Sequence, residues 1–453
     1  MSAGAWVVGS HPDRFRDFML RTSSVKTVNL GLIGLGTVGS GVVKVLQKNS
    51  ASIEKRTGIR LVLKRVAVRS LSKKRAVRVS RKLLTRHPED ILGDPSIDVV
   101  IELIGGIHPA REIIETALRN GKQVVTANKA LLAEQGEPIF GLADRCRKKL
   151  GFEASVCGGI PIIKALKEGL ASNQISHVLG IVNGTCNYIL TGMSQEGISF
   201  GAALKAAQTQ GYAEQNPHLD VDGIDSAHKL AILARLGFRS RVPFRKIHVE
   251  GIRSLSIIDI EYAKDLGYGV KLLAIGKDTS HGMELRVHPT MLPLDHPLSS
   301  VKGVYNAVFV HADQAGDLLF YGKGAGMFPT ASAVLSDIVD IAKRIAGQAD
   351  LKSPRPVKLA DKKVLPIAEI VSKYYLRFQV EDKPGVLGTL ARTLGKHHIS
   401  ILSVHQKESH DPRSVPVIIL TYEAREKNIL KALRTIHRDG VVQEKTVMVR
   451  VEQ

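Results

Sequence analysis

Cysteine and long apolar runs are scarce in this sequence, and each shortage excludes a class of protein. The 453 residues include three cysteines, Cys146, Cys157 and Cys186, and these form no Cys-x-x-Cys pair. An odd and scattered set favours neither a disulfide framework nor a zinc site, and it suits a reducing compartment. No apolar run approaches the ~20 residues of a membrane-spanning helix. We therefore expect a cytoplasmic protein with no membrane partner.

Acidic residues are also few, and the chain is strongly basic as a result. Its 43 Asp and Glu residues are outnumbered by 64 Lys and Arg residues, which gives a net charge of +21. Such an excess suggests attraction to polyanions. The basic residues are nevertheless dispersed, aromatic residues make up only 5%, and no nucleic-acid motif occurs. We expect no specific nucleic-acid partner, since a positive field would equally attract an anionic dinucleotide and a carboxylated substrate.

A cluster of carboxylates and a lysine stands out in the middle of the chain. The segment Gly211-Tyr212-Ala213-Glu214 is followed by Asp220, Asp222, Asp225 and Lys229. Asp225 and Lys229 are four residues apart, so they share one face of a helix that we expect to begin at Gly223. This arrangement suits a site that binds a charged amino acid and moves a proton. The simpler alternative is an exposed ion pair.

A glycine-rich turn follows the first apolar run of the chain. Residues 28–33 lead into Gly34-Leu35-Gly36-Thr37-Val38-Gly39, and a helical pattern comes next. This strand, turn and helix form the setting in which GxGxxG binds a dinucleotide. Gly34 would allow the tight turn, Gly36 the approach of the pyrophosphate, and Gly39 close packing of the helix on the sheet. Thr37 and Val38 would present the helix N-terminus to the anion.

The end of the second strand predicts which dinucleotide is bound. An NAD enzyme normally carries Asp or Glu there, to hold the ribose 2′-hydroxyl. The strand expected at residues 61–68 ends in Arg69 instead, with Lys73, Lys74 and Arg75 just beyond. These residues favour a 2′-phosphate, so we expect NADP as the cofactor, with NAD possible. The alternative is that Lys73 to Arg75 form only a solvated basic turn.

Further strands are expected at residues 99–104 and 123–126. The second leads into Ala127-Asn128-Lys129, at the carboxyl edge where an α/β sheet places its ligands. Lys129 is therefore a candidate catalytic lysine as well as a possible surface charge.

Together these segments resemble a known family. The resemblance is to homoserine dehydrogenase with a C-terminal ACT domain, and it covers roughly residues 26 to 450. The motifs that carry it occur in this order: GLGTVG, IELIGG, VVTANKALLA, FEASVCGGIPII, IVNGTCNYILTGM, GYAE, DVDGIDSAHKLAILA and YGKGAGMFPTASAV.

The resemblance implies an activity and roles for individual residues. The reaction would be the reversible, NAD(P)-dependent interconversion of L-homoserine and L-aspartate 4-semialdehyde, a step toward threonine, methionine and isoleucine. Lys229 matches the family's proton donor, and we expect its pKa to be lowered toward neutrality. Lys129 matches a second active-site lysine, which would also lie at the cofactor. The remaining matches are Glu214 on the substrate amino group, Asp225 near the reacting oxygen, Asp220 as a nearby carboxylate, and Gly211 and Gly326 at the cofactor.

The segment from Glu153 to Pro161 has a structural and a functional interpretation. From its residues alone it is a strand that enters a Gly-Gly-Pro turn. The resemblance implies instead that the turn binds a monovalent cation, Na⁺, through backbone carbonyls. The ligands would be Glu153, Val156, Gly158 and Ile160.

The expected fold is α/β, with three domains between an extension and a linker. We assign residues 1–25 to a frayed N-terminal extension or a mis-assigned start, and 26–152 to a doubly wound Rossmann domain. Residues 153–345 would form an α+β catalytic domain with a mixed sheet, including strands at 178–182, 246–254, 307–312 and 318–321 and a helix at 330–345 capped by Thr330. That sheet could build the interface of a homodimer or homotetramer. A linker would span residues 346–370.

Residues 371–453 have the order of a ferredoxin-like ACT domain. Strands are expected at 374–380, 399–405, 415–422 and 446–451, and helices at 385–397 and 426–437, which gives βαββαβ. We expect this domain to be a separate regulatory module. The implied effector is L-threonine near Asp382 and Gly385, although ACT domains also pair with one another without a ligand. Because about 25 residues before the first strand cannot hold a kinase, we expect a monofunctional enzyme.

Two other functions fit the same fold. One is an oxidoreductase that acts on another amino-acid semialdehyde, and the other is a catalytically silent amino-acid sensor. Glu214 and Asp225 favour a substrate that carries an ammonium group. The presence of both Lys129 and Lys229 argues against the silent sensor.

Overall fold

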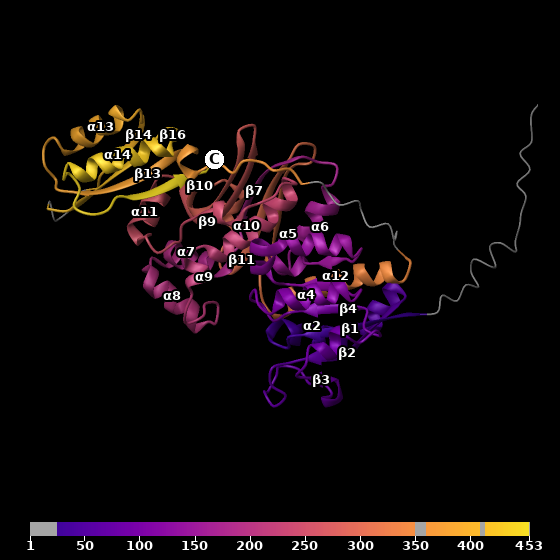
Figure 1. Ribbon diagram of the computed structural model, residues 1–453. Coiled ribbons are helices and arrows are strands. Elements are labelled where there is room, and N and C mark those ends of the chain that lie inside the picture. The colour runs from indigo at the N-terminus through magenta and orange to yellow at the C-terminus, as the bar shows by residue number, and fades with distance from the viewer. Residues whose placement is uncertain (1–24, 349–358, 408–412, 453) are drawn as a thin grey trace, which may run out of the picture.

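The computed structural model describes residues 25–348, 359–407 and 413–452 (Figure 1). The expected N-terminal extension and part of the expected linker lie outside these residues. Within them, the chain forms a six-stranded sheet and an 11-stranded sheet. None of the described helices is both long enough and apolar enough to cross a membrane.

The six-stranded sheet is the expected doubly wound nucleotide-binding domain. Its strands are parallel, in the order β3-β2-β1-β4-β5-β6. The strands are β1 (Lys26–Ile33), β2 (Ile59–Ala67), β3 (Leu84–Thr85), β4 (Val99–Glu102), β5 (Gln123–Thr126) and β6 (Leu150–Gly151). The helices are α2 (Thr37–Thr57), α3 (Glu89–Leu92), α4 (Ala110–Arg119) and α5 (Lys129–Arg145). Strand β6 ends at Gly151 and a 3₁₀ turn, η2 (Glu153–Ser155), follows, so the strand expected from Glu153 is wrong.

Helix α12 (Met327–Ile345) returns to this domain after the chain has built the second sheet. Its buried Ala331, Val334 and Ile338 share a hydrophobic core with residues of β1 and α2. The helix begins at Met327, with Gly326 at the N-cap position, so the expected cap at Thr330 is wrong. Thr330 lies buried one turn inside the helix. The nucleotide-binding unit is thus completed by a segment far away in the sequence.

The central part of the chain forms the mixed half of the 11-stranded sheet. Its strands run in the order β12-β11-β7-β9-β10, and β8 pairs with β10. They are β7 (Ile175–Ile181), β8 (His248–Val249), β9 (Tyr268–Thr279), β10 (Gly282–Pro293), β11 (Tyr305–Ala312) and β12 (Gly316–Lys323). The helices here are α6 (Ile162–Lys164), α7 (Gly184–Glu196), α8 (Phe200–Thr209), α9 (His218–Val221), α10 (Ile224–Gly237) and α11 (Ile257–Asp265), and a π-helical turn, η3 (Ala165–Gly169), follows α6.

The longest hairpin of this sheet, β9–β10, was not expected from the sequence. Both strands are buried along most of their length, so alternation of polar and apolar residues is absent. Polar residues such as Lys271 and Arg286 interrupt the apolar pattern. The strand expected at residues 246–254 is correspondingly reduced to the two residues of β8.

The C-terminal domain has the expected ferredoxin-like order but is not separate. Its strands β13 (Val371–Val380), β14 (Ile401–His405), β15 (Val415–Thr421) and β17 (Val447–Val451) run in the order β17-β13-β15-β14, and the short β16 (Ala424–Arg425) pairs with β13. The helices are α13 (Val386–Lys396) and α14 (Glu426–Arg438). Strand β17 also pairs with β10, through Thr290 with Arg450 and Met291 with Val451. One sheet therefore runs from the catalytic domain into the C-terminal domain, which corrects the expectation of an independent module.

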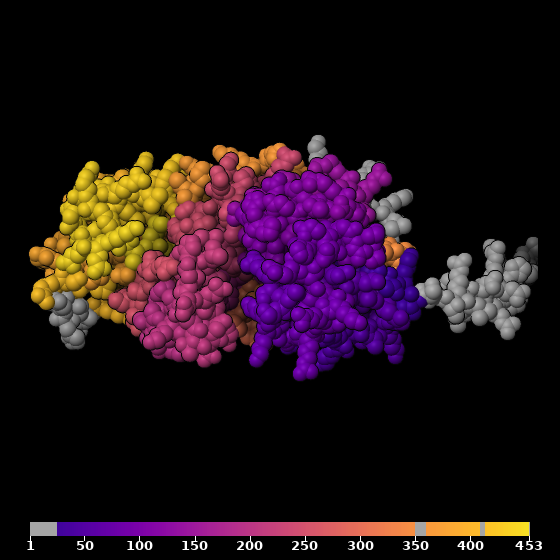
Figure 2. Space-filling model, turned by 60° about the horizontal axis from the view of Figure 1, so that its bottom comes forward, coloured from indigo at the N-terminus to yellow at the C-terminus, as the bar shows by residue number. Residues whose placement is uncertain are grey.

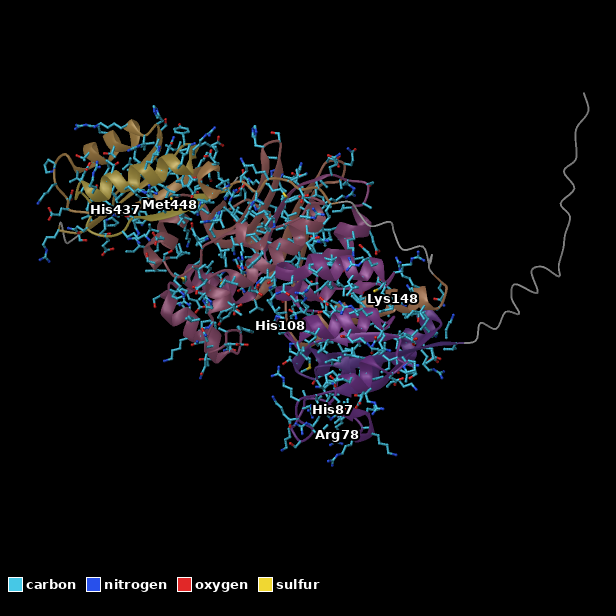
Figure 3. All side chains as sticks on the ribbon, in the orientation of Figure 1. Arg78, His87, His108, Lys148, His437 and Met448 are labelled. Atoms are coloured by element: carbon cyan, nitrogen blue, oxygen red, sulfur yellow. The ribbon has the colours of Figure 1, made fainter. Side chains whose placement is uncertain are left out.

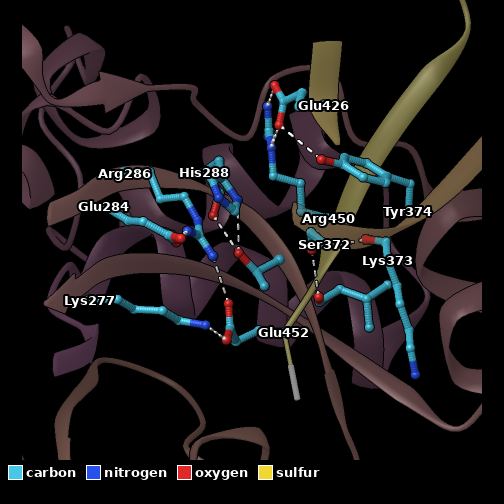
Figure 4. Close-up of polar contacts among 12 residues, drawn as sticks. Lys277, Glu284, Arg286, His288, Ser372, Lys373, Tyr374, Glu426, Arg450 and Glu452 are labelled. Atoms are coloured by element: carbon cyan, nitrogen blue, oxygen red, sulfur yellow. Dashed lines mark hydrogen bonds and ion pairs between the residues drawn. The ribbon is translucent and has the colours of Figure 1, made fainter. Parts of the chain in front are cut away.

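Buried charges reinforce this junction (Figure 4). Arg450 donates to both carboxylate oxygens of Glu426 at 2.6 Å and to those of Glu250 at 2.8 and 3.0 Å. Arg286 of β10 donates to Glu452 at 2.9 Å. Although burial alone would lower it, the pKa of Arg450 is raised by Glu426 and Glu250. The C-terminal domain is thus attached to the catalytic sheet by backbone pairing and by ion pairs together.

Candidate active site

The expected site residues gather where the two larger domains meet. Helices α5 and α10 lie against each other at this boundary (Figure 1), and a furrow separates the two parts on the surface (Figure 2). The N-termini of the two helices lie together, because Lys129 of α5 contacts Asp225 of α10.

The glycine turn has the geometry that a dinucleotide requires. Gly34 adopts a positive φ of 104°, and a Cβ there would stand 2.6 Å from the Leu103 carbonyl oxygen. A Cβ on Gly39 would stand 2.1 Å from the Gly34 carbonyl oxygen, so only glycine allows α2 to pack this closely. Among the described residues, apart from Gly36 and its two neighbours in the chain, none has an atom within 4 Å of the same position on Gly36. The turn is therefore crowded by neighbouring atoms at Gly34 and Gly39 but has free space at Gly36. This space lies next to the free N–H groups of the first turn of α2.

Two adjoining cavities extend from this turn, and their walls are basic. One, of about 640 Å³, includes Gly34, Gly36 and Thr37, and the other, of about 880 Å³, reaches to Arg78. Figure 3 shows Arg78 at the β3 end of the domain. Arg69 and Lys73 line both cavities, and neither side chain makes a hydrogen bond or ion pair with another described residue. Val38 lines neither cavity.

Buried polar residues position Lys129 at the carboxyl ends of β4 and β5. Glu102 accepts hydrogen bonds from the backbone of Ile104 at 2.8 Å and from the Thr126 hydroxyl at 2.6 Å. Asn128 caps α5 by accepting from Leu131 N, and it donates to the Gly106 carbonyl at 2.6 Å. These contacts fix the start of α5, so the ammonium of Lys129 lies at the domain boundary.

Asp225 lies between the two lysines. Its Oδ2 is 2.7 Å from Lys229 Nζ and its Oδ1 is 3.1 Å from Lys129 Nζ. Lys229 also donates to the Val182 carbonyl at 2.6 Å. Asp225 and Lys229 are 7% and 8% exposed, whereas the Lys129 side chain is 42% exposed. The alternative of an exposed surface pair is therefore wrong.

This cluster keeps its charged form, against one of our expectations. Burial alone would raise the pKa of Asp225, but Lys229 and Lys129 hold it well below its usual range. Burial alone would lower the pKa of Lys229, but Asp225 raises it above that of an ordinary lysine. The expected lowering of the Lys229 pKa is wrong, because the bonded carboxylate outweighs desolvation. The positive charge of Lys129 does not reverse this rise in the Lys229 pKa.

Asn183 belongs to the cluster, and the sequence analysis missed it. Its Nδ2 donates to Asp225 at 2.9 Å and to Asp220 at 2.7 Å, and its Oδ1 caps α7 at Cys186 N. An Asn directly after an apolar strand and before a helix is a recognisable N-cap signal. Burial raises the pKa of Asp220, with a contribution from Asp225, while the bond from Asn183 opposes the rise. Asn183 thus holds both carboxylates in one array.

Glu214 and Gly211 lie on a loop attached to α7. Thr185 donates to the Tyr212 carbonyl at 2.7 Å, and the Tyr188 and Tyr212 rings are 5.0 Å apart. Gly211 has a positive φ of 73°. The carboxylate of Glu214 is exposed and makes no hydrogen bond or ion pair with the described residues, so it is available to a ligand.

The segment expected to bind a cation is a buried turn against the glycine turn at Gly326. Both carboxylate oxygens of Glu153 cap the following helix, at Ile163 N and Lys164 N, each at 2.8 Å. The Glu153 side chain is thus engaged in capping this helix. The carbonyls of Val156 and Gly158 accept no hydrogen bond from the described residues. Among those residues, no group of three or more His, Cys, Asp or Glu side chains is placed to hold a metal ion.

The turn expected to bind the cation is in direct contact with the glycine turn that ends at Gly326. Gly159 N donates to the Lys323 carbonyl at 3.0 Å, and a Cβ on Gly158 would stand 2.6 Å from the Gly324 carbonyl oxygen. Gly326 has a positive φ of 116°. The carbonyl of Ile160 accepts from Ile162 N at 2.8 Å.

Comparison with known proteins agrees with this geometry. The homoserine dehydrogenase family model matches residues 161–339, the homoserine dehydrogenase NAD-binding domain matches residues 34–153, and the ACT domain matches residues 374–440. A homoserine dehydrogenase of Neisseria gonorrhoeae is 43% identical, over 94% of this chain and 99% of its own. The crystal structure of a homoserine dehydrogenase from Thiobacillus denitrificans has a TM-score of 0.89 at 44% identity, over 94% of this chain and 99% of that chain.

A more distant solved structure contains a bound dinucleotide. It is a hyperthermophilic archaeal homoserine dehydrogenase mutant in complex with NADPH, with a TM-score of 0.61 and 26% identity, and the match covers 73% of this chain and 99% of that chain. Taken with the glycine turn and the buried lysine–aspartate cluster, these similarities show that the chain belongs to the homoserine dehydrogenase family of nicotinamide-dependent oxidoreductases.

Proposed function

We propose that this enzyme interconverts L-aspartate 4-semialdehyde and L-homoserine with NADP(H). The observation that carries the proposal is the contact of Asp225 with two lysines at the boundary between the nucleotide-binding domain and the catalytic domain, where Lys229 is buried and Lys129 is partly exposed. A free carboxylate at Glu214 suits the ammonium group of the substrate. Glu214, Asp220 and Asp225 would bind the amino acid, and Gly211 would support the loop near the cofactor.

In the reducing direction, the residues handle a proton while the bound nicotinamide supplies the hydride. Charge develops on the aldehyde oxygen as the carbonyl is reduced. Lys229 Nζ is the donor of the proton to this oxygen, and its raised pKa keeps it protonated at neutral pH. Asp225 orients Lys229, and Lys129 adds a second positive charge toward the same oxygen. In the oxidising direction Lys229 must first lose a proton, so higher pH favours that reaction.

NADP is the preferred cofactor in this proposal. Gly34, Gly36, Thr37, Val38 and Gly39 would hold the pyrophosphate, Gly326 would lie at the nicotinamide, and Arg69 and Lys73 would bind the 2′-phosphate. Their unpaired side chains along the cavity wall support this assignment, as does the NADPH complex of the archaeal relative. Arg75 is less suitable, because it donates to the Lys73 carbonyl of its own loop.

Replacement of Arg69 by alanine is expected to weaken NADP selectively. Loss of a hydrogen bond to a charged group costs about 1.5 to 3 kcal/mol, so KM for NADP should rise about 10- to 100-fold. KM for NAD should stay within about twofold, because NAD lacks the phosphate. Lys64→Ala, which removes an exposed cation from β2, the strand that precedes Arg69, is the control. An equal loss of affinity for both cofactors would contradict the role of Arg69.

The pH profile of Asp225→Asn tests the pairing with Lys229. The substitution removes the charge that raises the Lys229 pKa and leaves the burial that lowers it. The protonated donor should therefore be lost at lower pH, and the rate of reduction should begin to fall about 1 to 3 pH units earlier. Asp222→Asn is the control, since Asp222 pairs with Arg253 and His218 outside the cluster. An unchanged profile in Asp225→Asn would refute the pairing.

A monovalent cation, Na⁺, completes the proposed site. Its ligands would be backbone carbonyls of Glu153, Val156, Gly158 and Ile160, of which those of Val156 and Gly158 accept no hydrogen bond from the described residues. L-Threonine is the proposed effector of the ACT domain, near Asp382 and Gly385, and the proposed assembly is a homodimer or homotetramer.

The proposed function is tested by the formation of reduced nicotinamide from L-homoserine. The purified enzyme should use NADP in preference to NAD, and L-threonine should slow the reaction if it acts through the ACT domain. A folded protein that gives no turnover with either cofactor would exclude this substrate.

A further inference from the structure

Another cavity lies at the opposite end of helices α5 and α10, whose N-terminal ends carry the site. Helices α5 and α10 run parallel, since contacts between them follow both chains in the same order. Lys129 contacts Asp225, Glu134 contacts His228 at 3.0 Å, and Arg235 lies 4.4 Å over the Phe140 ring. Helix α5 has 17 residues, which is about 25 Å measured along its path, and it is kinked at Gln135. The C-terminal ends of this pair therefore meet far from the reacting groups.

The cavity between these ends has a volume of about 560 Å³, which suits a small organic molecule. We call it the helix-end cavity. It is lined by the C-terminal parts of α5, α10 and α12, by residues 147–150 and by η3. Its apolar surface includes Phe140, Phe152, Leu166, Leu236 and Ile341. Residues of both the nucleotide-binding domain and the catalytic domain thus contribute to the apolar lining of the cavity.

The rim of the cavity is basic. Seven cationic side chains line it and one acidic side chain, Asp144, does so; the cations are Arg147, Lys148, Lys149, Lys167, Arg235, Arg239 and Arg344. Lys148 lies on the opposite side of the nucleotide-binding domain from His108 (Figure 3). Arg235 is paired with Glu137. The side chains of Arg147, Lys148, Lys149 and Arg344 make no hydrogen bond or ion pair with the described residues.

Helix ends explain only part of this charge. Basic residues are favourable beside the last carbonyls of a helix, and each helix end carries about half a negative charge. Three helix ends therefore balance fewer than two of the seven cations. Burial lowers the pKa of Lys149, and the neighbouring Lys167 and Arg344 lower it further. Glu168 and Asp337 act on the pKa of Lys149 in the opposite direction. The cations around the cavity still outnumber these nearby carboxylates.

Two of the rim arginines occupy strained backbone positions. Arg147 has a φ of 52° and Arg239 a φ of 47°, each just beyond the C-cap of its helix, α5 or α10. Glycine is the usual residue at such a position, because it adopts a positive φ without strain. Arginine at both positions disfavours the fold locally but puts two guanidinium groups on the rim. That of Arg239 donates one hydrogen bond to the Ala171 carbonyl at 2.9 Å and keeps its other N–H groups for a ligand. Strain retained in this way indicates a role for the side chains.

We propose that the helix-end cavity binds an amphiphilic organic anion. The apolar body of the ligand packs on the Phe140 and Leu236 side of the cavity, and its carboxylate, sulfonate or phosphate pairs with Arg147 and Arg239. Since the rim belongs to both domains, the ligand joins them at the end of α5 and α10 remote from Lys229. The site is separate from the dinucleotide cleft and does not depend on the activity proposed above.

The test uses the full chain with saturating NADP, so that the dinucleotide cleft is filled. The probe is 8-anilinonaphthalene-1-sulfonate, and its neutral counterpart is N-phenyl-1-naphthylamine; binding is followed by fluorescence. We expect one sulfonate site per chain, with an affinity at least ten times that for the neutral compound. The double variant Arg147→Gly with Arg239→Gly should weaken the sulfonate at least tenfold.

This variant removes the charges without straining the fold, because glycine suits both positions. Its melting temperature should equal or exceed that of the unaltered chain. The matched control is His398→Gly, which relieves a φ of 58° in the C-terminal domain and should leave probe binding unchanged. The proposal fails if the double glycine variant binds the sulfonate as tightly as the unaltered chain. It also fails if the neutral compound binds equally well, or if the chain does not bind the probe.

Discussion

Lys229→Ala is expected to lower the rate of semialdehyde reduction by about 10²- to 10⁴-fold, the usual contribution of a positioned proton donor. Lys229 is the buried member of the lysine pair, and its ammonium bonds Asp225 and the Val182 carbonyl. Without it, only water or the more distant Lys129 can supply the proton to the reduced oxygen. The dissociation constant of NADP should change little, since the glycine turn and Arg69 lie on other elements.

Chemical rescue distinguishes a proton donor from a structural residue. Truncation to alanine leaves space for a small amine, so methylammonium should restore part of the turnover of Lys229→Ala in a concentration-dependent manner. Lys229→Met removes the charge but fills the space, and it should show the same loss without rescue. Melting temperatures of both variants serve as the control for folding. Turnover near that of the unaltered enzyme in Lys229→Ala would refute the assignment.

The local parts of this site could be predicted from the sequence, because their evidence is local. Asp225 and Lys229 share a helix face by their spacing alone, and Gly34 to Gly39 carry a pattern that depends only on one turn and the helix after it. The ferredoxin-like order of the C-terminal domain follows in the same way from short periodic segments. Where a residue's neighbours in the sequence dictate its conformation, the expected and observed structures agree.

The missed features depend on contacts between distant residues. Lys129 and Asp225 are brought together only by the packing of α5 on α10, and the raised pKa of Lys229 follows from that three-dimensional arrangement of charges. Strands β9 and β10 are covered on both faces, so they lack alternation. Helix α12 follows the catalytic sheet in sequence but completes the core of the nucleotide-binding domain. None of these effects has a local signature.

The junction between the catalytic sheet and the C-terminal domain should be the most sensitive structural position. Arg450→Ala is expected to lower the free energy of unfolding by about 3 to 5 kcal/mol, because it leaves a buried carboxylate without its partner. Glu426 is 2% exposed and bonds Arg450 through both oxygens, so it bears this penalty. The Glu250 side chain is 36% exposed and keeps a bond to His248, so it can be hydrated. Urea unfolding followed by circular dichroism measures the change.

A second variant shows whether the stability lost in Arg450→Ala comes from the unpaired buried charge or from the lost packing of the side chain. Arg450→Met with Glu426→Gln removes both charges while keeping most of the volume, and the new amide retains an oxygen for the Tyr374 hydroxyl, which donates to Glu426 at 3.3 Å. Replacement of both partners of a buried pair is far less harmful than removal of one. The double variant should therefore recover most of the stability lost in Arg450→Ala. Arg438→Ala, at a side chain 79% exposed, should have no effect. If the double variant is as unstable as Arg450→Ala, the unpaired carboxylate is not the cause, and the backbone pairing of β17 with β10 must carry the junction.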